Sequence, residues 1–413
     1  MQSLRKYDPH TYLAPPRLKI LQVFSRYEYY GGEEGSVYRI GDGLQKRYDV
    51  EYFLTSTKDF LGRSWSKKAL IPFAVFWNHE IGSRLERYQR IGKFDLWQVH
   101  NVFPAMSPIV YHKAFRWGIP IVHYLHNYRF GCVNGFFLDH GQPCKRCMHG
   151  NFFHAVARKT WHESAIASGM LGAVISHTRR MGLFEKAARF IAISERQKAI
   201  HVEMGLPADK IDVVYHFYDK RIRSEPFPEN GHALFIGRLS PEKGILDLLE
   251  AWRLLARRDR KLVIAGEGPQ MPVLQAFVNK HNLTNVVFTG FVDASAQREL
   301  WTGSAFSVVP SIWEEPFGMV VLESWANTRP VIANRIGALP ELVTHGQNGL
   351  LAEPFNAQSL AQAMELAFAD QDLCRRMGEK GRLQLRAKFT RKQWLAEMTG
   401  IYLSLGIKPK EQK

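Results

Sequence analysis

Short apolar runs alternate with longer amphipathic stretches along nearly the whole chain, and this alternation restricts the fold more than any other feature. Apolar runs of about four to eight residues are typical of strands buried on both faces of a parallel sheet. The first half has such runs at 18–24, 50–55, 96–100, 119–126 and 189–193. Helical stretches, for example 36–46, lie between them. The pattern predicts an α/β fold with a doubly wound sheet and right-handed crossovers.

The alternation restarts after residues 225–230, a segment with two prolines and no periodicity that is typical of a linker. The second half has strand-like runs at 233–236, 261–265, 286–288, 305–309 and 331–333. We therefore predict two Rossmann-like domains facing each other across a cleft, one at 1–222 and one at 223–390. The helical segment 391–413 is expected to pack back on the first domain.

Length and composition agree with a globular protein of this kind. The chain has 413 residues, of which 46% are hydrophobic, enough for two or three domains. No apolar run reaches the roughly 18–20 residues of a membrane helix, and the first residues lack a hydrophobic signal core. We expect a cytoplasmic protein, in which four cysteines do not indicate a disulfide scaffold.

Positive charge is concentrated in the first half. Residues 1–222 carry 32 Lys and Arg against 19 Asp and Glu, a net charge of +13, whereas 223–413 carry 23 against 20, a net charge of +3. This asymmetry predicts a polyanionic partner. Because no zinc-finger or RNA-recognition motif is present, an anionic membrane surface or a phosphorylated substrate is favoured over nucleic acid.

Two carboxylates, Glu315 and Glu323, lie eight residues apart in PSIWEEPFGMVVLES. The first follows a predicted strand and the second lies in the helix predicted at 319–327. Ligands of open α/β sheets bind beyond the carboxyl ends of the strands, so both could accept hydrogen bonds from sugar hydroxyls. The alternative is a solvated turn and helix surface, and Glu314 is expected to be a solvated neighbour.

Basic and glycine-rich loops follow other predicted strands. Arg238 and Lys243 lie in GRLSPEKG before a helix, where two cations and free backbone N–H groups can bind a diphosphate. Gly266 and Glu267 follow the next strand, and residues 337–341 (GALPE) follow the last. Solvated or tight turns are the alternative for each of these loops.

These motifs, in this order, resemble the nucleotide-sugar half of glycosyltransferase family 4, which has the GT-B fold. The first half adds matching segments, including YGG at 30–32, QVHN at 98–101 and GIPIVHYLHNYR at 118–129. The resemblance covers roughly residues 18–400.

The resemblance implies a role for each site residue. Arg238 and Lys243 would hold the donor diphosphate, with Gly32, Gly266 and Glu267 beside the donor. Glu323 would bind the ribose hydroxyls, and Glu315 the transferred sugar together with the backbone N–H groups of Phe317 and Gly318. His126 would lie at the reaction centre, although it could also be a core histidine.

The resemblance further implies retention of anomeric configuration without a catalytic divalent metal. The only Asp-x-Asp, Asp370–Asp372, falls in a predicted helical connection and is interpreted as surface. Two departures from the family pattern lie near the cleft: His216–Phe217 replaces Asn-Gly, and Ala338 replaces a glycine.

Two segments suggest additional features. Cys132, Cys144 and Cys147, with His149 and His140 nearby, form a candidate structural zinc site; the alternative is reduced thiols packed in a loop. Residues 65–77 (WSKKALIPFAVFW) mix lysine with aromatic residues and are either an interfacial membrane helix or a core helix.

The sequence thus predicts a retaining glycosyltransferase at the inner face of a membrane, with no required cofactor. It would move a hexose from a UDP- or GDP-sugar to an acceptor, expected to be a lipid-linked or growing cell-surface polysaccharide. The rival hypotheses are a nucleotide-sugar epimerase with the same fold and a basic nucleic-acid-binding protein.

Overall fold

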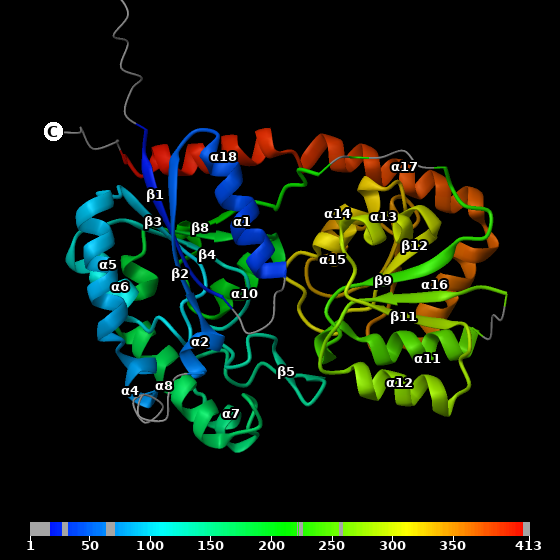
Figure 1. Ribbon diagram of the computed structural model, residues 1–413, viewed down its shortest axis with the longest axis horizontal. Helices are drawn as coiled ribbons and strands as arrows, with labels where there is room; N and C mark the ends of the chain where they lie inside the picture. Colours follow the sequence, from blue (N-terminus) through cyan, green and yellow to red (C-terminus); the bar gives the residue numbers. More distant parts are fainter. Residues whose placement is uncertain are drawn as a thin grey trace, which may run out of the picture.

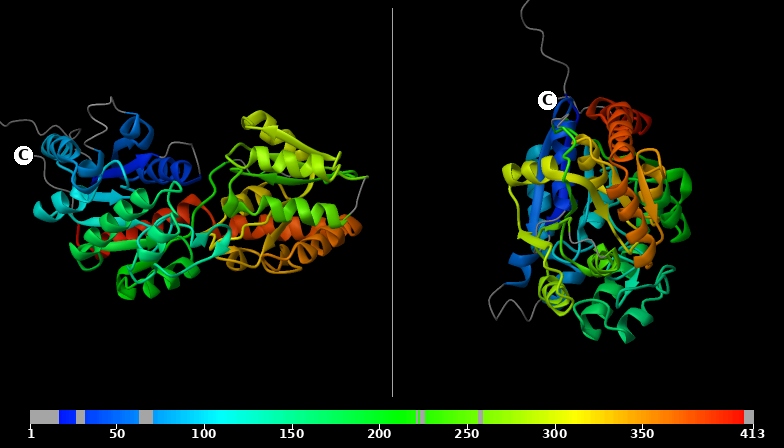
Figure 2. Two further views of the ribbon diagram at one scale, coloured as in Figure 1. Left: turned by 90° about the horizontal axis from the view of Figure 1, so that it is seen from below. Right: turned by 90° about the vertical axis from the view of Figure 1, so that its right-hand side faces the viewer.

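The computed structural model describes residues 17–26, 32–62, 71–220, 222, 226–255 and 259–407. These residues form two parallel six-stranded sheets, one in each half of the chain, with helices around them (Figure 1). Seen from below, the two halves lie side by side along the longest axis (Figure 2, left). This is the two-domain α/β fold that the sequence predicts.

The first sheet has the strand order β2–β1–β3–β4–β7–β8. Its strands are β1 (Lys19–Arg26), β2 (Asp49–Ser56), β3 (Leu96–Val99), β4 (Ile121–Tyr124), β7 (Arg189–Ala192) and β8 (Ile211–Val213). The helices of this half are α1 (Gly32–Gln45), α2 (Thr57–Leu61), α4 (Ile71–Phe76), α5 (His79–Gly92), α6 (Ile109–Arg116), α7 (Phe153–Ala157), α8 (Ala165–Arg180), α9 (Leu183–Lys186), α10 (Glu195–Glu203) and the 3₁₀ turn Ala208–Lys210. A short hairpin, β5 (Leu138–Asp139) and β6 (Gln142–Pro143), projects from it.

The second sheet has the order β11–β10–β9–β12–β13–β14. Its strands are β9 (His232–Ile236), β10 (Leu262–Ala265), β11 (Val286–Gly290), β12 (Ser304–Val309), β13 (Val331–Asn334) and β14 (Gly349–Ala352). Its helices are the 3₁₀ turn Pro241–Lys243, α11 (Ile245–Leu255), α12 (Met271–Lys280), α13 (Ala294–Gly303), α14 (Met319–Ala326), α15 (Leu339–Leu342), α16 (Ala357–Ala369) and α17 (Gln371–Lys388). The edge strands β8 and β14 were not among the predicted strands.

Burial explains the strand pattern. Every residue of β3, β4, β10, β12 and β13 is buried, as expected for central strands covered by helices on both faces; the edge strand β14 is buried as well. In each sheet the strand order reverses next to the first strand, between β1 and β3 and between β9 and β12. Such switch points open the crevice in which α/β sheets bind ligands.

The last helix, α18 (Arg391–Ser404), lies against the first half of the chain. Its Trp394 packs on Phe217, and its Tyr402 packs on Tyr48. Figure 1 shows α17 and α18 following one another along one side of the molecule, from the second sheet to the first. The first half is therefore completed by the end of the chain.

The two halves share apolar packing. Ile312 and Trp313, which follow β12, belong to the core of the first half. In a second cluster, Phe217 of the first half lies with Phe317 and Phe389 of the second. Within the described ranges, none of the helices combines the length and apolar character needed to cross a bilayer.

Candidate active site

The loops after β9 and β12 bring Lys243 and Glu315 together. Lys243 Nζ donates to Glu315 Oε2 at 2.8 Å and lies 5.4 Å from the centre of the Trp313 ring. Ser311 Oγ and Trp313 Nε1 donate to the same oxygen at 2.8 and 3.0 Å. Glu315 is buried, so three donors hold one of its oxygens in place and orient the carboxylate.

Arg238 lies in the same loop and is held by a buried carboxylate. Its Nη2 donates to Glu242 Oε1 at 2.6 Å, and Ser240 Oγ donates to that oxygen at the same distance. Burial alone would raise the pKa of the Glu242 carboxyl, but Arg238 and Lys243 outweigh it, so the pKa is lowered. Glu242 is therefore an anion that positions Arg238.

Glu323 belongs to α14, and Gly318 is the residue at the start of this helix. Gly318 precedes the helix with φ 99°, a conformation that favours glycine, and the helix start leaves backbone N–H groups for a ligand. Burial raises the pKa of the Glu323 carboxyl, while Lys220 and Arg39 act in the opposite direction. Phe317 is buried, with its ring 5.3 Å from that of His216.

The glycine loops pack tightly against one another. A Cβ on Gly266, whose φ is 140°, would lie 1.9 Å from Gly237 O, and one on Gly337 would lie 2.3 Å from Glu315 N. The backbone N–H of Ala338 donates to Glu315 O at 2.8 Å, a bond that the alanine at this position leaves intact. Glu267 Oε1 accepts a long bond, 3.4 Å, from Phe291 N.

His126 follows β4 and lies in a stack of aromatic rings. Its ring centre is 5.0 Å from His100, 5.2 Å from Tyr124 and 6.2 Å from His216. Burial lowers the pKa of His126 to about 3, with a further contribution from His123. The imidazole is therefore neutral at physiological pH. The departure at His216 also lies within this stack.

A small pocket of ≈ 20 Å³ lies beside His126, lined also by Glu33, His100 and Asn127. This volume is about that of one water molecule. Glu33 Oε2 accepts from Asn127 Nδ2 at 3.1 Å. Glu33 was not among the predicted site residues, although it is an acidic residue in a first helical turn after paired glycines, which is the signal that the sequence offers. Gly32 starts α1 with open space around its Cα.

Contacts between the halves correct one expectation. Glu314, predicted to be solvated, has a side chain only 14% exposed. Arg196 of α10 donates two hydrogen bonds to this carboxylate, of 2.6 and 3.0 Å. Lys145 Nζ lies 3.3 Å from Glu314 Oε1. The sequence does not show that the β5–β6 hairpin and α10 reach across to this carboxylate.

Glu341 makes a second contact between the halves. Its two oxygens accept from the backbone N–H groups of Glu195 and Arg196, at 3.0 and 2.6 Å, and from Tyr215 Oη at 3.0 Å. A carboxylate at a helix N-terminus is stabilised by the helix dipole. Glu341 of the second half therefore caps α10 of the first.

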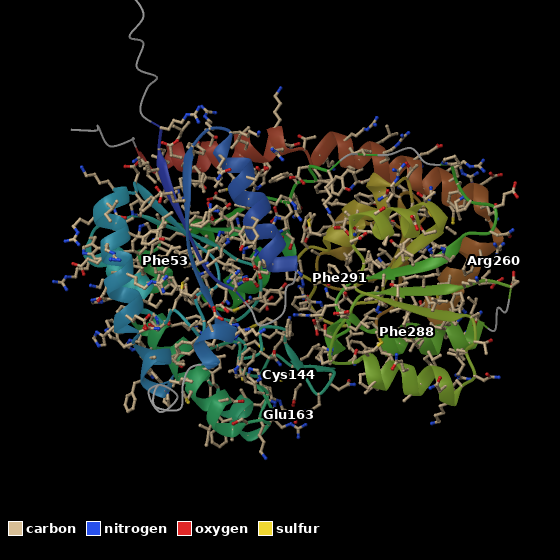
Figure 3. The ribbon with its side chains drawn as sticks, viewed as in Figure 1. Phe53, Cys144, Glu163, Arg260, Phe288 and Phe291 are labelled. Atoms are coloured by element: carbon tan, nitrogen blue, oxygen red, sulfur yellow. The ribbon has the colours of Figure 1, made fainter. Side chains whose placement is uncertain are left out.

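Cys132 and Cys147 belong to the core of the first half, whereas Cys144, labelled in Figure 3, lies on the side that faces the second half. All three thiols are free, and burial raises the pKa of Cys147 to about 11. Within the described part of the chain, no three His, Cys, Asp or Glu side chains are grouped so that they could share a metal ion. In this arrangement the side chains do not form a zinc site. Zinc binding by Cys132, Cys144, Cys147 and His149 stays a prediction. Nearby, His140 pairs instead with Asp139 at 2.6 Å.

Two other predicted features lie away from the cleft. Asp370 Oδ1 caps α17 by accepting from Leu373 N, and Asp372 pairs with Arg375, so the Asp-x-Asp serves a helix start. Residues 65–70 of the lysine- and tryptophan-rich segment lie outside the described residues. The rest contains α4, on which Phe73 is 73% exposed.

Comparison with known proteins assigns the family. Residues 30–221 match the model of Glycosyltransferase Family 4, and residues 219–384 match that of Glycosyl transferases group 1. The chain belongs to glycosyltransferase family 4. It is 32% identical over 177 residues to the alpha-D-kanosaminyltransferase of Streptomyces kanamyceticus, a match covering 42% of this chain and 46% of that protein. The chain thus spans about half the length of this curated relative.

Solved structures show that the fold is GT-B. Sucrose-phosphate synthase from Thermosynechococcus elongatus superposes with a TM-score of 0.71 at 18% identity, covering 94% of this chain and 99% of that one. Anabaena HepE in complex with UDP-glucose gives 0.67 at 20% identity, covering 94% and 100%. The fold predicted from the sequence is confirmed.

Proposed function

We propose that this family 4 chain is a retaining glycosyltransferase that moves a hexose from a UDP-sugar to a saccharide acceptor. The observation that carries the proposal is the arrangement around Glu315, where a cation and a buried carboxylate lie 2.8 Å apart at the mouth of the second sheet. Lys243 and Glu315 are close enough to serve two ends of one ligand, a diphosphate and a sugar.

The second half provides a group for each part of such a donor. Arg238 and Lys243 would offset the charge that develops on the leaving diphosphate, which is usually the largest electrostatic contribution to such a reaction. Glu315 and the N–H groups before α14 would bind sugar hydroxyls, and Glu323 the ribose. UDP is preferred to GDP as the nucleotide because the structurally similar HepE binds UDP-glucose.

Transfer on one face of the sugar accounts for retention in this proposal. A double displacement requires a carboxylate nucleophile against the anomeric carbon. Among the described residues that line the pocket beside His126, Glu33 supplies the carboxylate. Its Oε2 already accepts a hydrogen bond from Asn127. The leaving phosphate would instead accept the proton of the incoming hydroxyl.

The acceptor is proposed to be a lipid-linked saccharide at a membrane surface, for a cell-surface polysaccharide. Three large apolar side chains are strongly exposed on the helices at one end of the first half: Phe73 on α4, Phe153 on α7 and Ile166 on α8, at 73%, 77% and 77%. The net charge of +13 on this half favours an anionic bilayer. Peripheral binding at the inner membrane face would bring such an acceptor to the cleft.

Release of nucleoside diphosphate from a panel of UDP- and GDP-sugars tests the donor. We expect turnover of a UDP-hexose, and a fall of roughly 10²–10³-fold in Lys243→Met and Glu315→Gln. Lys280→Met, a cation at the end of α12, is the matched control and should keep full activity. The proposal fails if no nucleotide sugar is consumed, or if the two site variants behave like the control.

A further inference from the structure

Two glutamines lie in the centre of the first sheet, where the neighbouring strand residues are apolar. Gln22 of β1 and Gln98 of β3 are register partners on adjacent strands, and both are fully buried. Gln98 Nε2 donates to Gln22 Oε1 at 3.3 Å. Buried amides in a sheet centre are costly unless they are hydrogen-bonded, so their partners indicate what they hold in place.

The glutamines are part of a chain of hydrogen bonds that reaches the cleft. Tyr402 Oη, on α18, donates to Gln98 Oε1. At the other end, Gln22 Oε1 lies 2.5 Å from His100 Nε2, and His100 Nδ1 lies 2.7 Å from His126 Nε2. This hydrogen-bond chain therefore connects α18 to the histidine at the candidate reaction centre.

The phenol at the buried end sets the direction of the chain. Among the described residues, the hydrogen-bond partner of Tyr402 Oη is Gln98. Burial raises the pKa of Tyr402 well above 10, so the phenol stays protonated and donates a hydrogen bond to Gln98. Gln98 must then present its oxygen to Tyr402 and its amide N–H groups to Gln22. Gln22 in turn presents its oxygen to His100.

The direction of the chain determines where the protons of the two histidines lie. An amide oxygen only accepts hydrogen bonds, so His100 carries its proton on Nε2. Burial lowers the pKa of His100 well below 6.5, helped by His126, His123 and His216, so the ring is neutral and its Nδ1 is an acceptor. His126 must then donate from its Nε2. Its own Nδ1 is left unprotonated, and makes no hydrogen bond to a described residue.

We propose that Gln22 and His100 are positioning residues that hold His126 with its proton on Nε2, so that its Nδ1 accepts a hydrogen bond from a hydroxyl of the bound sugar. The sugar in this statement rests on the proposed function, whereas the proton position does not. His126 is thus an acceptor for a hydroxyl rather than a proton donor. The tautomer is thus set by the buried side chains of Gln22, Gln98 and Tyr402, which reach His126 only through His100.

Nitrogen-15 NMR of histidine-labelled protein tests the proton position directly, because protonated and unprotonated ring nitrogens have distinct shifts. The His126 signals are assigned by their loss in His126→Gln. We expect a protonated Nε2 and an unprotonated Nδ1 in the wild-type chain. A protonated Nδ1 would overturn the inference and leave the proposed function standing. If the protein gives the expected spectrum but turns over no nucleotide sugar, the proton position stands and the proposed function fails.

Substitutions in the hydrogen-bond chain test its role in turnover. Gln22→Met and Tyr402→Phe should shift both His126 nitrogens toward values averaged between tautomers. They should also lower kcat by about 2- to 10-fold, with little change in the KM for the donor. Tyr48→Phe is the matched control, since Tyr48 packs on Tyr402 but hydrogen-bonds to Thr399, and it should change neither readout. Wild-type shifts and kcat in a folded Gln22→Met protein would refute the positioning role.

Discussion

Replacing Glu323 with glutamine should weaken UDP binding and make it insensitive to the 2′-hydroxyl of the ribose. The carboxylate is an acceptor for both ribose hydroxyls in the proposed donor site. Glutamine keeps the shape, but it turns one of the two oxygens into an N–H donor. The hydroxyl facing that atom then loses a charge-assisted hydrogen bond.

The burial of Glu323 indicates that the binding free energy lost lies in the upper part of the range usual for one hydrogen bond to a charged group. Hydrogen bonds to charged groups contribute about 1.5–3 kcal/mol, which corresponds to roughly 10- to 150-fold in Kd. Burial raises the pKa of Glu323 despite the nearby charges of Lys220 and Arg39, so the carboxylate is poorly solvated and gains more from a ligand hydroxyl than a surface carboxylate would.

Calorimetric titration with UDP and with 2′-deoxy-UDP measures the effect. Wild-type protein should prefer UDP, whereas Glu323→Gln should bind both nucleotides equally and weakly. Glu379→Gln, an exposed carboxylate on α17, is the control and should retain the preference. The ribose assignment is refuted if Glu323→Gln still discriminates between the two nucleotides.

The same group predicts a pH dependence with a definite sign. Because the pKa of Glu323 in the folded protein is raised above 4.5, UDP affinity of the wild type should fall as pH falls through that raised pKa. Without ligand, ionisation of Glu323 costs stability as pH rises through the same range. Glu323→Gln should therefore have a higher Tm than wild type at pH 8, and this advantage should shrink at pH 4.

Two further substitutions test the framework around the site. Glu341→Gln should lower the free energy of urea unfolding by about 1–2 kcal/mol, since it weakens the cap on α10. The exposed Glu353→Gln should cost under about 0.5 kcal/mol, and equal effects would contradict the capping role. Gly266→Ala should cost about 2–4 kcal/mol, because its Cβ would collide with a carbonyl oxygen at a positive φ. Gly400→Ala, with open space in α18, should instead gain about 0.5–1 kcal/mol in thermal melts, and similar melts for both would refute the collision.

Much of the fold could be predicted from local pattern. Central strands such as β12 are continuous apolar runs, and their period and length are visible without any tertiary information. The edge strand β8 is only three residues long with one of them buried, and β14 begins with a glycine, a residue depleted in strands. Such strands depend on pairing with a neighbour, which the local sequence does not show.

The candidate site could be predicted only where residue type and loop position coincide. Lys243 and Glu315 follow strands of one sheet, so their meeting could be expected from topology. The partners of Glu314 and Glu341 could not, because they come from the other half of the chain. Trp313 stands only two residues before Glu315, but its role was not predicted, because the sequence does not show that its ring is buried in the core of the first half.

The position of α18 has a consequence for how the protein is made. Trp394, Met398 and Tyr402 are buried against residues of the first half, yet the ribosome adds them only after the whole second half. Until then Gln98 lacks the phenol that satisfies its oxygen, and the apolar surface around Tyr48 is uncovered. Domains usually fold in order as they emerge, but here the first domain must wait for the second to be synthesised. The hydrogen-bond chain from Tyr402 to His126 can form only once α18 is in place.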